Sequence, residues 1–318
     1  MPECVIIIPN YNGVALKYKG KPVIKTCLDS INKSAYKNYK IIVTDDHSYD
    51  ESVQYLKIHY KYLDILKNNV NLGYEKNVNK AIQYAFRKYK FDYLILLNSD
   101  VIITDRYWIN KLKDIAKSQK DVGLIGCKLI YPNGKIQKAV IRFNDRFALK
   151  NFNTGDAQKW KYNSICEAEV IEAAMHFIKR ETIEKIGLLD ENLVNGYDDE
   201  DYCLRVKENG LKVIYDGKLS IIHLQNFTLG KTKNSKELEN RLYSNMRNRF
   251  YFLRKHRRKM TLIQFIGWHV LYTLNHFVII KTKKNEKLSL KSIGFKEHVF
   301  HNFLMPLKAF LDAQKLNW

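Results

Sequence analysis

Four short, largely apolar runs alternate with amphipathic stretches in the first hundred residues, and this pattern limits the fold more than any other feature. The runs are Val5–Ile8, Lys40–Val43, Leu63–Leu66 and Tyr93–Leu97. Runs of this length, bounded by polar residues, are typical of buried strands. Between them, apolar residues recur at helical spacing in the stretches 23–32 and 74–89. The alternation predicts an α/β fold with a mostly parallel sheet, right-handed crossovers and flanking helices.

Polar residues follow the strands directly, as in Pro9–Asn12 after the first, Thr44–Ser48 after the second and Asn98–Asp100 after the fourth. In an open α/β sheet, ligands bind outside the carboxyl ends of the strands. A carboxylate at Asp100 would be well sited to hold a divalent cation against a phosphate. The alternative is that Asn98 and Asp100 only form a turn and cap the next helix.

Several classes of protein are disfavoured by what the chain lacks. No GxGxxG follows the first strand and no GxxxxGK[ST] occurs, which argues against a dinucleotide-binding half and a P-loop. The five cysteines are scattered without CxxC spacing, which argues against a zinc site or a disulfide framework and fits a reducing compartment. The N-terminus does not resemble a signal peptide, so we expect a cytoplasmic location.

Beyond residue 100 the pattern is more irregular. We expect helices at about 108–118, 181–187 and 202–209, β-structure at 122–131 and 169–179, and a hairpin turn at 132–134. The segment Arg142–Ser164 is predicted as a long loop. Two strands, Leu211–Tyr215 and Leu219–Ile222, follow, and the second ends at His223.

Four consecutive acids, Asp198–Asp201, stand at the start of the helix that ends before Gly210. Pairing with the helix dipole is worth a few tenths of a kcal/mol per carboxylate, and one capping Asp would suffice for it. Four adjacent acids repel one another, so the cluster needs another reason, and a functional site is one.

The composition changes from Lys231 onward, which predicts a domain of residues 1–230 and a basic, helical region of 231–318. The whole chain has a formal net charge of +21, which implies an anionic partner such as nucleic acid, a membrane surface or a phosphorylated substrate. The apolar segment Leu262–Ile280 approaches transmembrane length but contains four polar residues that are costly at a bilayer centre. It is consistent with an in-plane helix on an anionic membrane surface, or with an amphipathic helix packed on the catalytic domain.

The order of several motifs resembles one enzyme family. The segments are VIIIPNYNG, CLDSI, IIVTDDHSYDES, NLGYEKNVNKAI, YLILLNSDV, IGLLDEN, DDEDYCLRVKENGLKV and SIIHLQNFT, within about residues 4–225. Together they resemble family-2 inverting glycosyltransferases of GT-A fold, of the non-processive, rhamnosyltransferase-like kind. The resemblance implies transfer of a sugar from a UDP- or dTDP-sugar to a hydroxyl of a glycan or lipid-linked acceptor, in polysaccharide or cell-surface glycan synthesis. It also fits a peripheral location at the inner face of the cell membrane.

The resemblance assigns roles by position. Residues beside the nucleotide would be Pro9, Tyr11, Asn12, Asp45, Gly73, Asn77, Asn98 and Ser99. Asp45 would accept the imide N–H of a pyrimidine base, which a carboxylate can do. Asp100 and His223 would bind Mg²⁺ or Mn²⁺, and Asp199 would be the general base.

Three further residues, Asp198, Asp201 and Glu172, are candidates on the acceptor side. The chain departs from the family pattern at Asp198, which replaces a glutamate, at Glu172, which stands where small residues are usual, and at His47. Two other classes stay open: a nucleic-acid-binding protein, which only the charge suggests, and an inactive glycosyltransferase-like scaffold. The sequence does not identify the sugar, the acceptor or the oligomeric state.

Overall fold

The computed structural model describes residues 1–139, 141–143, 149–151, 162–194, 196–224, 235–256 and 305–316. The chain divides into two compact units. The first contains Met1–Glu191 and Asp198–Lys231, and the second contains Asn192–Tyr197 and Thr232–Trp318. The division into functional domains at residue 230 stays a prediction.

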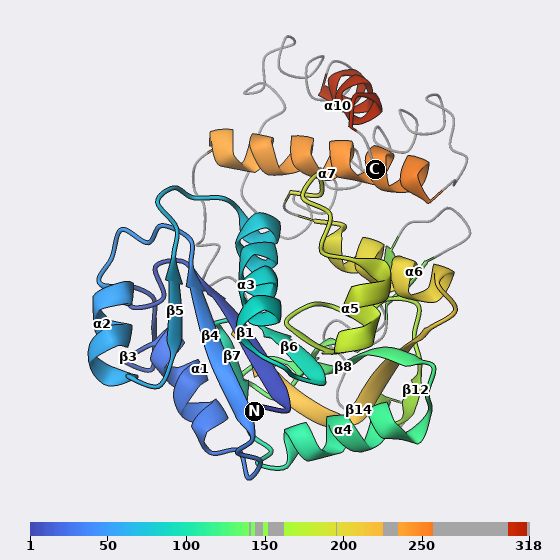
Figure 1. The fold of residues 1–318 in the computed structure, drawn as a ribbon. Coiled ribbons are helices and arrows are strands. Elements are labelled where there is room, and N and C mark those ends of the chain that lie inside the picture. The colour runs from blue at the N-terminus through green and yellow to red at the C-terminus, as the bar shows by residue number, and fades with distance from the viewer. Residues whose placement is uncertain are drawn as a thin grey trace. The chain divides into compact units, whose positions relative to one another are not determined.

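One large mixed sheet forms the centre of the first unit (Figure 1). Its strands, in spatial order, are β12 (Ile165–Glu167), β14 (Lys212–His223), β8 (Val122–Ile130), β13 (Met175–Lys179), β6 (Tyr93–Leu97), β1 (Cys4–Asn10), β4 (Tyr39–Asp45) and β5 (Asp64–Lys67). The strands β6, β1, β4 and β5 are parallel, as predicted, and β13 runs antiparallel between β6 and β8. The carboxyl ends of β1, β4 and β6 therefore meet at one edge of the sheet.

Helices cover both faces of this sheet (Figure 1). One face packs against α1 (Val23–Asn32), α2 (Ser52–His59) and α4 (Trp108–Ser118), and the other against α3 (Tyr74–Lys88), α5 (Arg180–Ile186) and α6 (Asp198–Glu208). Strand β1 shows why its run is wholly apolar: Ile6 and Ile8 face one layer, while Val5 and Ile7 face the other. The predicted α/β architecture with flanking helices is thus confirmed.

Strand β14 is one continuous strand rather than the two that the sequence suggests. Its register against β8 shifts between Asp216 and Ser220, so the polar residues between the apolar halves form a bulge. Position 217 within the bulge accepts only glycine, because a Cβ there would lie 2.2 Å from the carbonyl oxygen of Tyr162. The residues Asp216–Lys218 looked like a turn between two strands, although they are accommodated inside one strand.

The prediction of one long loop over residues 142–164 is wrong in part. Strand β10 (Ile141–Phe143) pairs antiparallel with β11 (Leu149–Asn151), while 144–148 and 152–161 lie outside the described residues. The β-structure expected at 169–179 is also shorter, since β13 begins only at Met175. The hairpin turn at 132–134 is confirmed, because β9 (Ile136–Lys138) pairs antiparallel with β8 and Gly134 has a φ of 80°.

Two shorter features complete the first unit. Strand β7 (Val101–Ile103) pairs antiparallel with the end of β14, with Val101 opposite His223. A small hairpin of β2 (Lys17–Tyr18) and β3 (Lys21–Pro22) follows β1. The pairing of β7 with β14 matters most for the site, because it brings residue 100 next to residue 223.

The second unit contains the helices α7 (Ser235–Lys255) and α10 (Met305–Gln314). They contact each other through the rings of Phe250 and Phe310, whose centroids are 4.8 Å apart, and through Arg254, which donates to the carbonyl oxygen of Gln314 at 2.6 Å. Among the residues that the structure describes, no helix is both long and apolar enough to span a bilayer. The segment Leu262–Ile280 lies outside them, so both interpretations of it stay predictions.

Candidate functional site

The ends of β1 and β4 are joined by a buried hydrogen-bond network around Asp45. Its Oδ2 accepts from the Asn10 amide at 2.8 Å and from the Ser48 hydroxyl at 2.6 Å, and its Oδ1 accepts from the Ser48 backbone N–H at 3.0 Å. Asp45 is fully buried. Since a carboxylate has about four lone-pair sites, these contacts occupy most of its capacity and shape the loop after β4.

Asn12, two residues after the end of β1, restrains the same loop. It adopts a left-handed backbone with a φ of 54°, which Asn tolerates better than most residues. Its side-chain oxygen accepts from the backbone N–H of Tyr49 at 3.0 Å. The ring of Tyr49 meets that of Tyr11 edge-on, with centroids 6.1 Å apart, and both rings are exposed. Two exposed aromatic rings beside Pro9 can offer apolar faces to a flat ligand.

Asp46, the neighbour of Asp45, organises the turn that enters α3. Its carboxylate accepts from the backbone N–H of Leu72 at 2.8 Å and of Gly73 at 3.0 Å. Gly73 precedes α3 with a φ of 83°, which favours glycine. Asn77 is buried and exchanges side-chain hydrogen bonds with Thr44, at 2.6 and 3.1 Å. Gly73 and Asn77 are therefore fixed near the end of β4, and Asn77 uses its amide internally.

Asp100 and His223 lie together at the end of β6, although they are far apart in the sequence. The Oδ1 of Asp100 is 3.3 Å from the Nε2 of His223, and both side chains are buried. The backbone N–H of Leu224 donates to the carbonyl oxygen of Asp100 at 2.9 Å, which extends the pairing of β7 with β14. The sheet thus aligns a carboxylate oxygen and an imidazole nitrogen.

Gln137 on β9 orients His223. The Nδ1 of His223 lies 2.7 Å from the Oε1 of Gln137, and the Nε2 of Gln137 donates to the backbone carbonyl of His223 at 3.3 Å. With the amide oxygen as acceptor, the imidazole proton sits on Nδ1 and the lone pair of Nε2 points towards Asp100. This is the usual orientation of a metal-ligating histidine, whose other nitrogen donates to an oxygen acceptor.

The donor set of Asp100 and His223 fits a divalent cation whose remaining ligands come from a bound diphosphate. Mg²⁺ is typically bound by one or two carboxylates together with substrate phosphates and water. Within the described parts of the chain, no group of three or more His, Cys, Asp or Glu side chains could hold a metal by itself. The geometry therefore supports a site that is completed by the ligand.

Asp199, in the first turn of α6, is linked to the end of β6 through two adjacent alanines. Its Oδ2 accepts from the backbone N–H of Ala173 at 2.9 Å. The backbone N–H of Asn98 donates to the carbonyl oxygen of Ala174 at 3.1 Å. One short segment thus joins the acidic cluster to the Asn98–Asp100 motif, which brings the residues proposed for base and metal into the same site.

The acids around Asp199 hold protons more tightly than usual. Burial raises the pKa of Asp199 well above its ordinary value, and repulsion from Glu200 raises it further. The pKa of Asp198 is raised by burial and by Asp199, and that of Tyr74 by burial and by the same two carboxylates. The hydrogen bond from Ala173 lowers the pKa of Asp199 but does not reverse the shift. A carboxylate with raised proton affinity is suited to act as a general base.

The other two acceptor-side candidates differ in their surroundings. Glu172 forms an ion pair with Lys138 at 3.1 Å, and both side chains are partly exposed. Asp201 is fully buried and forms an ion pair with the Nε of Arg205 at 2.8 Å. The guanidinium of Arg205 also donates to two backbone carbonyls. These contacts support a structural role for Asp201 and leave Glu172 accessible.

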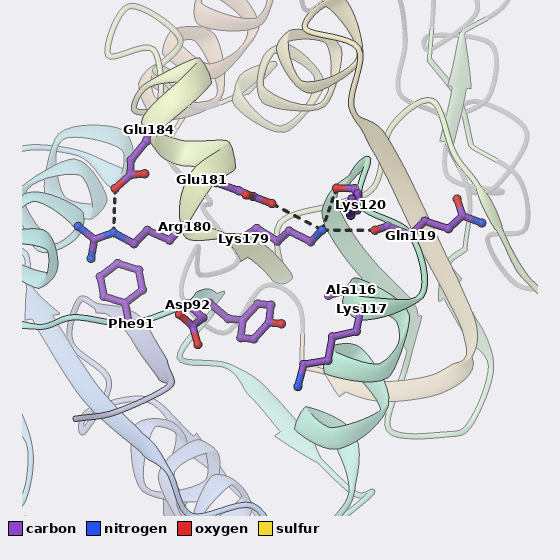
Figure 2. Close-up of a pocket in the computed structure, with 11 residues that line it drawn as sticks. Phe91, Asp92, Ala116, Lys117, Gln119, Lys120, Lys179, Arg180, Glu181 and Glu184 are labelled. Carbon is purple, nitrogen blue, oxygen red and sulfur yellow. Dashed lines mark hydrogen bonds and ion pairs between the residues drawn. The ribbon is translucent and has the colours of Figure 1, made fainter.

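A cavity of about 420 Å³ lies elsewhere, between the amino end of β6 and the start of α5 (Figure 2). It is bordered by Tyr93, the first residue of β6, and by Lys179, the last residue of the antiparallel β13. The Lys179 ammonium is bound to the carbonyl oxygen of Lys120 at 3.0 Å and pairs with Glu181 at 3.7 Å. Because it opens at the amino end of β6, we do not assign the chemistry to this cavity.

The residues of the candidate site that were not identified from the sequence include Asp46, Tyr49, Gln137 and Lys138. Asp46 had a signal, since it is the second of two adjacent acids at a strand end. Gln137 and Lys138 had none, because they reach the site only through the hairpin of β8 and β9.

Comparisons with known proteins agree with this architecture. Residues 5–180 match the family model described as Glycosyl transferase family 2. The O-antigen biosynthesis protein RfbC of Myxococcus xanthus is 23% identical over 236 residues, which are 70% of this chain but 17% of that protein. The chain thus spans about a sixth of the length of this relative.

Two solved structures share the fold at low sequence identity. One is S. aureus TarS 1-349 in complex with UDP-GlcNAc, with a TM-score of 0.58, 14% identity, and coverage of 98% of this chain and 80% of that one. The other is the mannosyltransferase PcManGT from Pyrobaculum calidifontis in complex with GDP-Man and Mn²⁺, with a TM-score of 0.53, 14% identity, and coverage of 82% and 65%.

Proposed function

The chain belongs to glycosyl transferase family 2, and from this premise we propose that it transfers a sugar, with inversion, from a nucleoside diphosphate sugar to a hydroxyl of a glycan or lipid-linked acceptor. One observation carries the proposal: Ala173 and Ala174 join Asp199 to the Asn98–Asp100 motif by hydrogen bonds of 2.9 and 3.1 Å. A general base and a phosphate-binding group must act on the two sides of one anomeric carbon. The segment Ala173–Ala174 is hydrogen-bonded both to Asp199 and to Asn98, at the start of the Asn98–Asp100 motif.

The nucleotide would bind at the carboxyl ends of β1 and β4. The exposed rings of Tyr11 and Tyr49 offer apolar faces for a base, and Asp45 remains our candidate acceptor for the imide N–H of uracil or thymine. The hydrogen bonds from Asn10 and Ser48 hold the Asp45 carboxylate in one orientation. Gly73 and Asn77 would border the same pocket, and Asn98 and Ser99 would lie on its diphosphate side.

The diphosphate would bind at Asp100 and His223. A bound Mg²⁺ or Mn²⁺ would neutralise the negative charge that develops on the leaving nucleoside diphosphate. The residues of the chain contribute a carboxylate oxygen and an imidazole nitrogen at 3.3 Å, and Gln137 fixes the imidazole tautomer. PcManGT was solved with GDP-Man and Mn²⁺, and this supports a divalent cation for the present chain.

Asp199 would take the proton from the acceptor hydroxyl as the new bond to the anomeric carbon forms. The Ala173 N–H fixes one carboxylate oxygen, which leaves the other to face the acceptor. The raised pKa of Asp199 brings its proton affinity closer to the working pH, and general-base catalysis of this kind contributes about 10²- to 10⁴-fold. Glu172, with Lys138 beside it, is our candidate for contact with an acceptor hydroxyl.

The acceptor is proposed to be a glycan of the cell surface, in keeping with the O-antigen biosynthesis protein that the chain resembles. A lipid-linked glycan would suit a basic C-terminal region at the inner face of the membrane. An inactive scaffold is disfavoured, because a scaffold would not need Asp100 and His223 to be buried together with Gln137 orienting the imidazole.

The test is release of nucleoside diphosphate from a panel of UDP-, dTDP- and GDP-sugars, with and without a glycan acceptor. We expect release from one donor class, near-background release in EDTA, and recovery with Mn²⁺ or Mg²⁺. The anomeric configuration of the product, read by NMR, should be opposite to that of the donor. Absence of turnover with every donor would refute the proposed activity, and full activity in EDTA would refute the role of the metal.

A further inference from the structure

The segment that leads directly into the acidic cluster is held by the second unit. Residues Asn192–Tyr197 belong to that unit, and the next residue, Asp198, begins α6. The last two residues of the segment have a left-handed backbone, with φ values of 139° at Gly196 and 69° at Tyr197. A tyrosine at positive φ is costly and persists only where its surroundings impose it.

Asn248 of α7 provides the main restraint. Its amide nitrogen donates to the carbonyl oxygen of Val194 at 2.7 Å and to that of Gly196 at 2.9 Å. Its amide oxygen accepts from the guanidinium of Arg247 at 2.7 Å, which fixes the amide so that both N–H groups face the segment. Asn248 is fully buried. A buried amide in the middle of a helix, with both of its N–H groups donated to one short segment, contributes more than helix stability.

Two further contacts restrain the ends of the segment. Arg247 donates to the carbonyl oxygen of Asn192 at 2.8 Å. The ring of Tyr197 packs on that of Phe252, with centroids 5.2 Å apart. Helix α7 therefore donates hydrogen bonds to three backbone carbonyls of the segment 192–197. It also packs against the ring of Tyr197, the residue just before Asp198.

We propose that Asn248 is a positioning residue for Asp199: by binding the carbonyls of Val194 and Gly196, it sets the backbone from which the acids of α6 start. This inference rests on the proposed role of Asp199 as the base. It gives α7 a part in the transfer reaction that does not depend on membrane binding. Since misplacement of a reacting group by about 1 Å costs about 10²-fold in rate, a modest shift of this segment is enough to slow transfer.

The test compares Asn248→Asp with Asn240→Asp in the full chain. Asn248→Asp keeps the pairing with Arg247 but places a carboxylate against two carbonyl oxygens. Asn240 stands eight residues earlier on the same helix and is exposed, so Asn240→Asp introduces the same charge without that conflict. The measurements are kcat for transfer, KM for the donor, the affinity for nucleoside diphosphate with Mn²⁺, and hydrogen exchange.

We expect Asn248→Asp to lower kcat by about 10-fold or more while the donor KM and the nucleoside diphosphate affinity stay within about 2-fold. Amide exchange should accelerate in peptides covering 192–203 and stay unchanged over 93–103. Asn240→Asp should behave like the unaltered chain. An unchanged kcat and unchanged exchange in folded Asn248→Asp would overturn the proposal, as would equal loss of transfer and nucleotide affinity.

If Asn248→Asp does not fold, the milder Phe252→Leu carries the same expectations and the same refuting results. It removes the ring that packs on Tyr197 and, on its other neighbour, on His256. If the unaltered chain turns over no donor, the proposed function fails. Hydrogen exchange then still decides whether Asn248 holds the start of α6.

Discussion

Exchanging each of two acids in the first turn of α6 for asparagine should separate chemistry from stability. Asp199 and Asp201 lie two residues apart, and each exchange removes the same single charge. Their surroundings differ: Asp199 accepts one backbone hydrogen bond in a cluster of acids, whereas Asp201 is fully buried against Arg205. The two variants are therefore matched controls for each other.

Asp199→Asn should abolish the base without harming the fold. We expect kcat to fall by about 10²-fold or more with little change in donor affinity, because the amide keeps the shape but cannot take a proton. The pKa of Asp199 is raised in the folded state, so the native chain binds more protons than the unfolded chain just above the ordinary carboxyl pKa. The contribution of Asp199 to the free energy of unfolding therefore declines as the pH rises from the ordinary carboxyl pKa to the raised pKa of the folded state. Asp199→Asn has no carboxyl group to titrate and does not lose this free energy. At about pH 8 its midpoint of thermal unfolding should be no lower than that of the unaltered chain.

Asp201→Asn should have the opposite effect. Removal of one partner from a buried ion pair costs about 3–5 kcal/mol. We take the lower end, about 3 kcal/mol, because Arg205 keeps its hydrogen bonds to the carbonyls of Ile186 and Leu188 and the new amide can still accept one. At about 2–4 °C per kcal/mol, the midpoint of unfolding should fall by about 6–12 °C. Turnover per folded molecule at low temperature should be retained.

Thermal melting by circular dichroism and donor turnover at about 20 °C, measured on both variants and on Asp198→Asn, would decide the matter. If Asp201→Asn is inactive yet as stable as the unaltered chain, while Asp199→Asn turns over normally, the base is Asp201 and our assignment within the cluster is wrong. Loss of activity in both, without loss of stability in either, would refute the structural role of the pair with Arg205.

Three other outcomes are expected, two from the geometry of the candidate site and one from the basic C-terminal region. Gln137→Met removes the acceptor that orients His223, so Mn²⁺ affinity measured by calorimetry with nucleoside diphosphate should fall by about 10- to 100-fold; unchanged affinity would refute the orienting role. Lys138 lowers the pKa of the proposed base and Glu172 raises it, so Lys138→Met should move the acid limb of the kcat profile to higher pH and Glu172→Gln to lower pH; shifts in the opposite sense would contradict the assignment of the base. The full chain should co-sediment with anionic liposomes and be only partly released at roughly 1 M salt, where the Debye length is about 3 Å, whereas a chain ending near Lys231 should not bind; failure of the full chain to bind would leave the packed-helix interpretation of Leu262–Ile280.

The sequence alone determined most of the first half of the sheet. In β1, β4 and β6, the strands predicted from apolar runs are present, because burial on both faces requires a short unbroken apolar segment, which its length and its polar boundaries reveal. Helix α1 was predicted with its bounds, since one apolar stripe at helical spacing suffices to locate a helix packed on a sheet. The polar residues after each strand marked the edge of the sheet where the candidate site lies, and the role of each residue stays a prediction.

Elsewhere local patterns were poor guides. The bulge at Gly217 looked like the end of a strand, and the pairing of β10 with β11 left no periodic signal, because each of these strands has only three residues. Pairing in such short strands depends on the partner that the fold supplies.

Only the tertiary structure decided how the site is assembled. The sequence marks four adjacent acids but does not say which of them faces the candidate site, because residues two apart on a helix are rotated by about 200° about its axis. Asp201 has Arg205 four residues later on the same helix, a spacing that is visible in the sequence, but only the fold brought Asp199 to Ala173. It also brought Gln137 to His223, and Asn248 to the carbonyls before Asp198. Such contacts join residues far apart in the chain, and local periodicity carries no information about them because they form only when the strands and helices pack.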